Sequence, residues 1–266
     1  IDEPYQAGDY LYHFGGIDDV WLGLWGILRA YAQPQGNLPP LCGQKPRVPC
    51  LAPPSGAVIR KFEIAAIQKD LVYNRFGDHD PEGLLFVPLN QAEDVRRGCR
   101  QPVPLILRAN AGDWIQVTLH NLFDPKVPIR QNEYPSVPVE QKHTPSNRVS
   151  LNPQFLKYDP IASSGVNVGY NPTEQTVGPG EKIQYLWHAD REYGAALLTS
   201  FGDLRNHRHH GLFGAILIEP PKAKYYRGIR PDRNHHGEQA VITAPGVEPY
   251  REFVLFAHNG IRLLDR

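Results

Sequence analysis

The stretch DWIQVTLHN, residues 113–121, decides the fold class of this chain. Its apolar side chains Ile115, Val117 and Leu119 alternate with polar side chains. A repeat of two residues is typical of a β-strand that buries one face and exposes the other. The stretch therefore predicts a half-buried strand.

The same alternation occurs on both sides of this stretch. It is found around Phe62 and Ile64, and again in residues 182–189, while residues 214–220 form a short apolar run that ends at a proline. The 26 prolines and 24 glycines interrupt the chain too often for long helices. We therefore expect an all-β Greek-key sandwich over residues 58–220.

Composition changes along the chain suggest four parts. Residues 1–32 contain a strand, a loop and a second strand, as at the end of a preceding domain, and residues 33–57 form a Pro-rich linker. Residues 58–222 form a complete domain, with a long loop at 125–171. Residues 223–266 are expected to be a linker and the opening strand of a following domain. The opening Ile1-Asp2-Glu3-Pro4 and the absence of methionine suggest a processed piece of something longer.

Charge and hydrophobicity exclude two classes of partner. The chain has 28 basic and 28 acidic residues, so it offers no basic field for nucleic acid. Its apolar runs are far shorter than the ~20 residues of a membrane helix, so no membrane span is expected.

The three cysteines form no CxxC pair. Cys42 and Cys50 flank a proline-rich stretch, where a short disulfide loop is feasible in an oxidising compartment. Cys99 is then either free or paired outside this segment. None of the three lies in a strand flanked by histidines.

Longer motifs carry a family resemblance. Two segments share a Gly-Leu-aromatic-Gly turn before an apolar strand, namely GLWGIL at 23–28 and GLFGAI at 211–216. The motifs that carry the wider likeness are ILRANAGDWIQVTLHN (106–121), SNRVSLNPQFLKYD (146–159), NVGYNPTEQTVGPGEKIQYLWHAD (167–190) and NHRHHGLFGAILIEP (206–220). Together they resemble the cupredoxin domains of large bacterial multicopper oxidases of the manganese-oxidase-like group, over residues 8–29 and 58–220.

The resemblance implies a cupredoxin-like fold and a copper-dependent parent protein. Such oxidases take electrons from a metal ion or small reductant through type 1 copper and give them to dioxygen at a trinuclear cluster. It also implies a secreted protein, extracellular or periplasmic, whose partners are other cupredoxin domains of the same protein and the reductant. A type 1 site holds copper with a thiolate and two imidazoles, and its axial residue tunes the potential.

Within the central domain the implied copper ligands are incomplete. His207 matches the type 1 histidine and Leu212 the axial position, but Leu197 and Leu198 lie where the thiolate is expected. The segment 199–201 lies where the resemblance implies a His-x-His of the trinuclear site. Asn152 lies where it implies a further histidine.

The first fragment is similarly incomplete. His13 matches one histidine of a His-Cys-His strand, whereas Phe14, Gly15 and Asp19 replace the cysteine, the second histidine and a later ligand. The segment is therefore expected to be scaffold, without a complete type 1 site.

The histidine cluster of residues 206–210 is still a candidate metal site. Strand alternation would put His207 and His209 on one side, where they could bind a metal with a third ligand. The alternative is a polar loop that forms hydrogen bonds across a domain interface. His188 is a possible third ligand or a half-buried structural histidine, and His235-His236 is expected to be exposed. The candidate metal ligands are His207, His209, His210, His188 and His13.

Other motifs fit ordinary structure. The segment 78–83, DHDPEG, has oxygen ligands that suit calcium, but its residues are also typical of an ordinary turn. Ser150 and Ser200 show no positioned His/Asp partners, and Gly178-Pro179-Gly180 precedes a strand rather than a phosphate-binding helix.

Two hypotheses follow. In the first, the chain is a scaffold segment of a copper-dependent oxidase. In the second, it is a non-catalytic cupredoxin-like module that builds domain interfaces or binds a partner.

Overall fold

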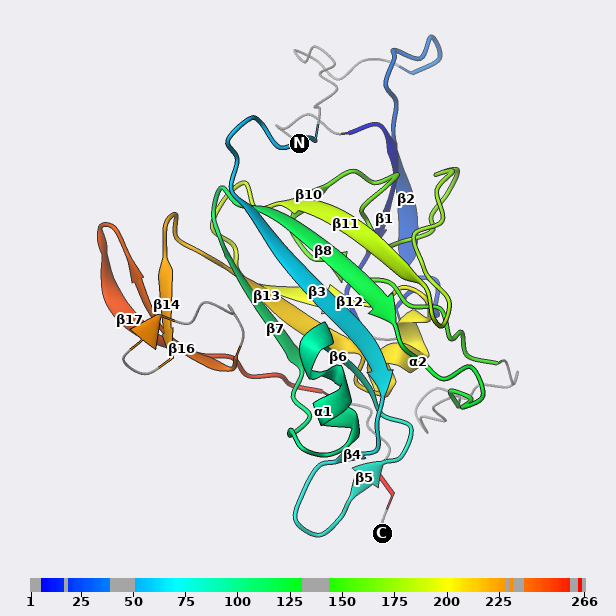
Figure 1. Cartoon of the computed structure of the whole chain (residues 1–266). Coiled ribbons are helices and arrows are strands. Elements are labelled where there is room, and N and C mark those ends of the chain that lie inside the picture. Colours follow the sequence, from blue (N-terminus) through cyan, green and yellow to red (C-terminus); the bar gives the residue numbers. More distant parts are fainter. Residues whose placement is uncertain are drawn as a thin grey trace.

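The chain folds around a two-sheet β-sandwich, with a small sheet on either side (Figure 1). The computed structural model describes residues 6–16, 19–38, 51–130, 144–227, 230–231, 237–258 and 263–264. Cys42, Cys50, His235 and His236 lie outside the described residues. The predictions made for them stay predictions.

The first sheet of the sandwich has five strands, in an order that differs from the sequence order. In spatial order they are β10 (Lys157–Tyr158), β11 (Lys182–His188), β8 (Trp114–Asn121), β3 (Ile59–Gln68) and β6 (Leu84–Pro88). β8 pairs with β3 in parallel and with β11 in antiparallel register. The predicted strand 113–121 is therefore central in its sheet.

The second sheet has four strands. In spatial order they are β7 (Leu105–Asn110), β13 (Phe213–Glu219), β12 (Gly194–Thr199) and β9 (Asn152–Pro153). β13 and β7 are parallel, and β12 and β13 form an antiparallel hairpin. Strands that follow one another in sequence repeatedly cross between the sheets. The all-β Greek-key sandwich predicted from the sequence is confirmed.

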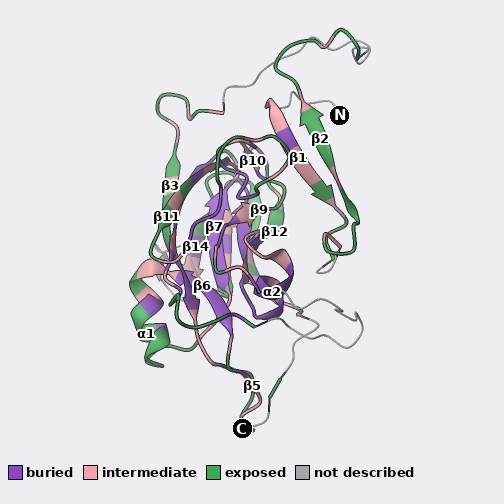
Figure 2. Cartoon of the chain, turned by 90° about the vertical axis from the view of Figure 1, so that its right-hand side faces the viewer, coloured by how far each residue is buried: buried purple, intermediate pink, exposed green. Residues whose placement is uncertain are grey.

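The main core lies between the two sheets. Ile115, Val117 and Leu119 of β8 are fully buried there with Tyr185 and Trp187 of β11. The second sheet contributes alternate residues of β7, β12 and β13 to the same cluster. Figure 2 shows the buried residues concentrated in this interior. The period-two prediction thus identified the inward face correctly.

Two further sheets flank the sandwich. β1 (Gly8–His13) and β2 (Trp25–Ala30) form an antiparallel N-terminal hairpin. The C-terminal sheet consists of β15 (Arg230–Pro231), β14 (Lys224–Arg227), β16 (Gln239–Ala244) and β17 (Val247–Phe253). Residues 223–266 therefore contain a four-stranded sheet, where the sequence indicated a linker and one strand.

The remaining elements are short. β4 (Leu71–Val72) and β5 (His79–Asp80) form a small ladder, which Leu264 joins through a bridge to His79. A 3-10 turn (Leu89–Gln91) leads into α1 (Ala92–Arg96), and α2 (Leu204–His209) connects β12 to β13. None of the helices in the described residues is long and apolar enough to cross a membrane.

Candidate functional site

The histidine cluster lies on α2, a helix of one and a half turns between the two strands of the β12–β13 hairpin. Asp203 begins the helix: its Oδ1 accepts a hydrogen bond from the backbone N–H of Asn206 at 3.0 Å. A carboxylate at this position satisfies a backbone donor that has no partner inside the helix. This cap explains why the chain turns helical directly after Gly202.

The helix corrects the prediction that strand alternation puts His207 and His209 on one side. In an α-helix successive residues are rotated by about 100°, so two residues separated by two positions point to nearly opposite sides. Both side chains are buried, but they face different parts of the molecule. Asp203 is an N-cap residue, a helix-start signal that could have predicted this.

His207 is held by hydrogen bonds from both ring nitrogens. Nε2 lies 2.8 Å from the carbonyl oxygen of Ser146, which can only accept, so Nε2 carries the proton. Nδ1 lies 2.9 Å from Ser200 Oγ, and in this neutral tautomer it must accept the hydroxyl proton. Burial lowers the pKa of His207, which agrees with the neutral form. Both of its nitrogens are therefore occupied within the chain.

Ser200 completes this hydrogen-bond network. Its Oγ accepts the backbone N–H groups of Ser150 at 3.2 Å and Gly202 at 3.3 Å while its hydroxyl donates to His207. This Ser–His pair is not visible in the sequence, because the partners meet only through the turn after β12. Both side chains are fully buried, so no substrate can reach the hydroxyl. The pair is not arranged for nucleophilic catalysis.

His210 is held differently. Its Nδ1 lies 2.8 Å from Asp80 Oδ2, and its Nε2 lies 3.0 Å from the carbonyl oxygen of Arg130. Burial disfavours the charged ring, but the contact with the Asp80 carboxylate outweighs it and raises the pKa of His210. With protons on both nitrogens the ring has no lone pair for a metal.

The other candidate ligands lie apart from this network. His188 stacks on Trp114 with ring centroids 4.6 Å apart, and burial lowers its pKa. His13 accepts a hydrogen bond from the backbone N–H of Gly15 at 3.0 Å and meets the ring of Phe201 edge-on. His209 acts electrostatically on His258, on the segment that follows β17. The described residues contain no group of three or more His, Cys, Asp or Glu side chains placed to hold a metal.

A type 1 copper site does not fit the residues around His207. Leu198, where the resemblance expects the thiolate, is fully buried in the sandwich core. At Gly202, in the turn that follows, a Cβ would lie 1.9 Å from the carbonyl oxygen of Arg148, so no longer side chain can be placed there. Cys99 is exposed in the loop after α1, among the described residues. In the part of the chain that the structure describes, no thiolate lies beside His207.

The acidic segment 78–83 is taken up by structural contacts. Asp80 binds His210 and also accepts the backbone N–H of Glu82. His79 binds Asp70, and Asp78 accepts a hydrogen bond from the side chain of Asn74. These groups serve a turn and the β4–β5 ladder.

Comparison with known proteins finds likeness only among solved structures. No protein-family model and no curated protein matches the chain. A multicopper oxidase from Pseudomonas thermotolerans is 16% identical, with a TM-score of 0.40, over 64% of this chain and 32% of that protein. A copper nitrite reductase from Nitrosomonas europaea is 17% identical, with a TM-score of 0.37, over 62% of this chain and 42% of that one.

A further solved structure, described as a multicopper oxidase, is 18% identical, with a TM-score of 0.41, over 71% of this chain and 55% of that protein. The matched part thus spans between about a third and just over half of these proteins. The sandwich is assigned from the strand pairing of this chain. The copper activities named for these proteins are reported for them and not for this chain.

Proposed function

We propose that this chain is a scaffold segment of a multicopper-oxidase-like protein of the manganese-oxidase-like group and holds no type 1 copper of its own. The single observation that carries the proposal is the closed hydrogen-bond network of His207. The residue at the type 1 histidine position is neutral, fully buried and engaged at both nitrogens. Binding copper through either ring nitrogen would break the hydrogen bond at that nitrogen, in a core whose described residues supply no thiolate.

In this proposal the copper chemistry belongs to other domains of a larger secreted protein, extracellular or periplasmic. Those domains would take electrons from a metal ion or small reductant and pass them to dioxygen. This chain would supply the end of one domain (1–32), a linker (33–57), a complete domain (58–222) and the beginning of another unit (223–266). The separate sheets at the two ends of the described chain support this division.

A second candidate is a module that binds a partner without any copper in the parent protein. It is favoured by apolar side chains that stay exposed on and beside the N-terminal hairpin. Tyr12, Phe14, Trp21, Leu22 and Leu28 are each more than 40% exposed. Exposed apolar groups gathered on one element are typical of an interaction surface.

Copper content per chain tests the proposal. We expect the chain of residues 1–266, loaded with copper and then dialysed, to retain no stoichiometric copper, with or without His207→Ala. The substitution should lower the midpoint of thermal unfolding. His120→Ala is the matched control, since His120 lies on the outer face of β8, bound to Glu63. Stoichiometric copper that is lost in a folded His207→Ala variant would refute the proposal.

Copper analysis of the full-length protein separates the two candidates. Copper with an intense absorption near 600 nm would support the oxidase, with its thiolate outside this chain. A full-length protein that contains no copper would contradict the oxidase and support the partner-binding module.

A further inference from the structure

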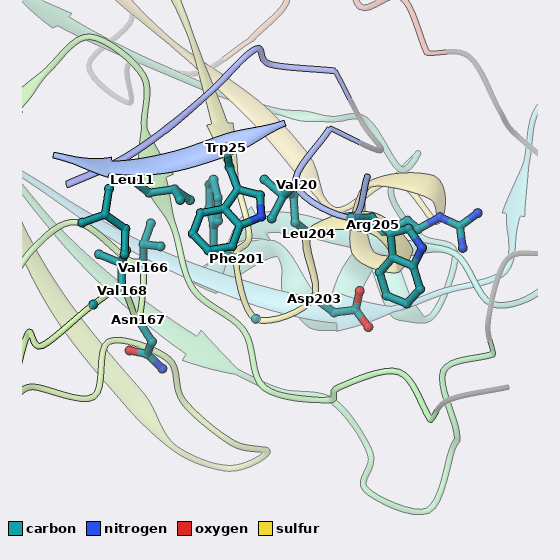
Figure 3. A pocket seen from close by; sticks show the side chains of 14 residues that line it. Leu11, Val20, Trp25, Val166, Asn167, Val168, Phe201, Asp203, Leu204 and Arg205 are labelled. Carbon is teal, nitrogen blue, oxygen red and sulfur yellow. The ribbon is translucent and has the colours of Figure 1, made fainter. Parts of the chain in front are cut away.

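A cavity of about 560 Å³ lies between the N-terminal hairpin and the sandwich domain. Leu11, Trp25 and Ile27 line it from the hairpin, and Val168, Phe201 and Leu204 from the opposite side (Figure 3). We call it the interface cavity. Its volume falls within the roughly 300–1,000 Å³ typical of small-molecule sites.

Two anchors hold the hairpin over this cavity. At one end, Arg29 donates two hydrogen bonds to the Asp9 carboxylate at 2.6 and 2.7 Å, and Asp9 also accepts the backbone N–H of Tyr170. At the other end, Arg208 of α2 donates to the carbonyl oxygens of Gly15 and Gly16. Because the hairpin is fixed on both sides of the cavity, the space between is a built feature of the fold.

The cavity walls are mainly apolar and aromatic. Trp21 and Trp25 both line the cavity, and each is 47% exposed, so a bound molecule would remove much indole surface from water. In Figure 3 the ring of Trp25 reaches from β2 into the space between the hairpin and the sandwich domain. Aromatic walls favour planar rings, which can stack or meet them edge-on.

The two charged side chains of the cavity are already engaged. The Asp203 carboxylate accepts hydrogen bonds from the backbone N–H groups of Ser146 and Asn206 and from the Asn206 amide. The Arg205 guanidinium lies over the Trp21 ring, 5.5 Å from its centroid. One negative and one positive group leave the walls with no net charge. Walls without net charge suit a neutral molecule better than an ion, which has to give up its hydration on entry.

We propose that the interface cavity binds a neutral, planar molecule of about two or three fused rings. The ligand stacks on the indoles and lies against the aliphatic side chains of the sandwich domain. Its polar edge accepts a hydrogen bond from the indole N–H of Trp25. This side chain is half-exposed, and its N–H can only donate. By contacting both walls, the ligand ties the hairpin more firmly to the sandwich domain. This site is independent of copper, and its test is separate from the copper measurements.

The test uses N-phenyl-1-naphthylamine, a neutral probe with a planar naphthalene unit, whose emission rises in apolar surroundings. We expect saturable, one-to-one binding by the 266-residue chain, with quenching of tryptophan emission. Trp21 and Trp25 line the cavity, so their emission should be quenched most strongly. Val168→Trp fills the cavity and should weaken binding by at least about tenfold. Its thermal midpoint should not fall, because the added ring occupies existing space.

Two further variants make the test decisive. Ile27→Trp fills the cavity from the hairpin side and should give the same loss, so it replaces Val168→Trp if that variant does not fold. Phe253→Ala removes an exposed aromatic ring from β17 and should leave binding unchanged. The proposal is overturned if the parent chain shows no saturable binding. It is also overturned if a folded filling variant binds the probe as the parent does.

Discussion

Ser200, His207 and the Ser146 carbonyl form a continuous hydrogen-bond chain inside the sandwich domain. The donor and acceptor roles along this chain are fixed. The carbonyl can only accept, so the neutral ring donates to it through Nε2 and accepts the Ser200 hydroxyl proton at Nδ1. A buried polar network of this kind costs little while every member is satisfied and much when one is removed. The cluster thus behaves as a structural polar core.

Ser200→Ala tests this role at a single atom. The change leaves His207 Nδ1 without its donor and the N–H groups of Ser150 and Gly202 without their acceptor. We expect a loss of about 1–3 kcal/mol in the free energy of unfolding, measured by denaturant titration. Ser55→Ala, at an exposed position, should have almost no effect. Equal stability of the two variants would contradict the structural role.

Asp80→Asn tests the ion pair with His210. Because the pKa of His210 is raised in the folded state, the pair stabilises the protein fully below the ordinary histidine pKa of 6.5. That contribution is lost as the pH rises through the raised pKa. We expect the parent chain to lose stability as the pH rises above 6.5, and the variant to lose less. Thermal unfolding at each pH measures both slopes, and identical slopes would refute the assignment.

Residue contacts were only partly predictable from the sequence. Alternation placed Tyr185 and Trp187 inside and His188 on the other face, because period two is a local property of a strand. The partners of His207 were not predictable, since Ser146 lies 61 positions away. The helix around it was missed because six residues are too few for a helical repeat.

At the scale of elements, the N-terminal hairpin depends on its attachment to the sandwich domain. A two-stranded sheet is marginally stable at best in water, and this one keeps apolar groups exposed. The Asp9 carboxylate is buried and is held by Arg29 and the Tyr170 N–H. Gly169, at φ 54°, lies so close that a Cβ would be 1.9 Å from Asp9 Oδ2. The hairpin is therefore docked by a specific clamp.

Arg29→Lys should weaken that clamp, since an ammonium group cannot form the two parallel hydrogen bonds of a guanidinium. We expect faster hydrogen exchange in residues 8–13 and 25–30, with exchange in β8 and β11 unchanged. The matched control is Arg97→Lys, since Arg97 follows α1 directly and forms an exposed pair with Glu93. Exchange that stays slow in the hairpin of the Arg29 variant would show that the clamp does not hold it.

For the whole molecule, the sequence could predict strands but not their order. The alternation in β8 and β11 and the apolar run of β13 are local signals, whereas the parallel pairing of β3 with β8 joins residues more than 50 positions apart. The C-terminal sheet was missed for a related reason. Its core is small, with Ala223, Tyr225, Ala240 and Ile242, so its strands alternate too weakly to stand out.

That sheet joins the sandwich domain through a buried polar junction. Arg108 of β7 donates to Glu219 of β13 at 3.0 Å and also to Glu252 of β17. Tyr250 donates to the other oxygen of Glu219 at 2.7 Å. Two carboxylates thus share one buried guanidinium. One carboxylate belongs to the sandwich and the other to the C-terminal sheet. Removing the charge of one carboxylate should therefore strengthen the junction.

The pH dependence of this junction gives the last prediction. Burial, together with the charge of Glu252, raises the pKa of Glu219 from its ordinary 4.5 to about 7. Between these values the folded state binds more protons than the unfolded state, so stability falls as the pH rises. Glu219→Gln mimics the protonated form and should remove that slope. Thermal unfolding from about pH 4.5 to 7.5 measures it, with Glu248→Gln at an exposed position as the control. If Glu219→Gln keeps the slope of the parent chain, Glu219 is ionised throughout this range and the junction carries its full charge.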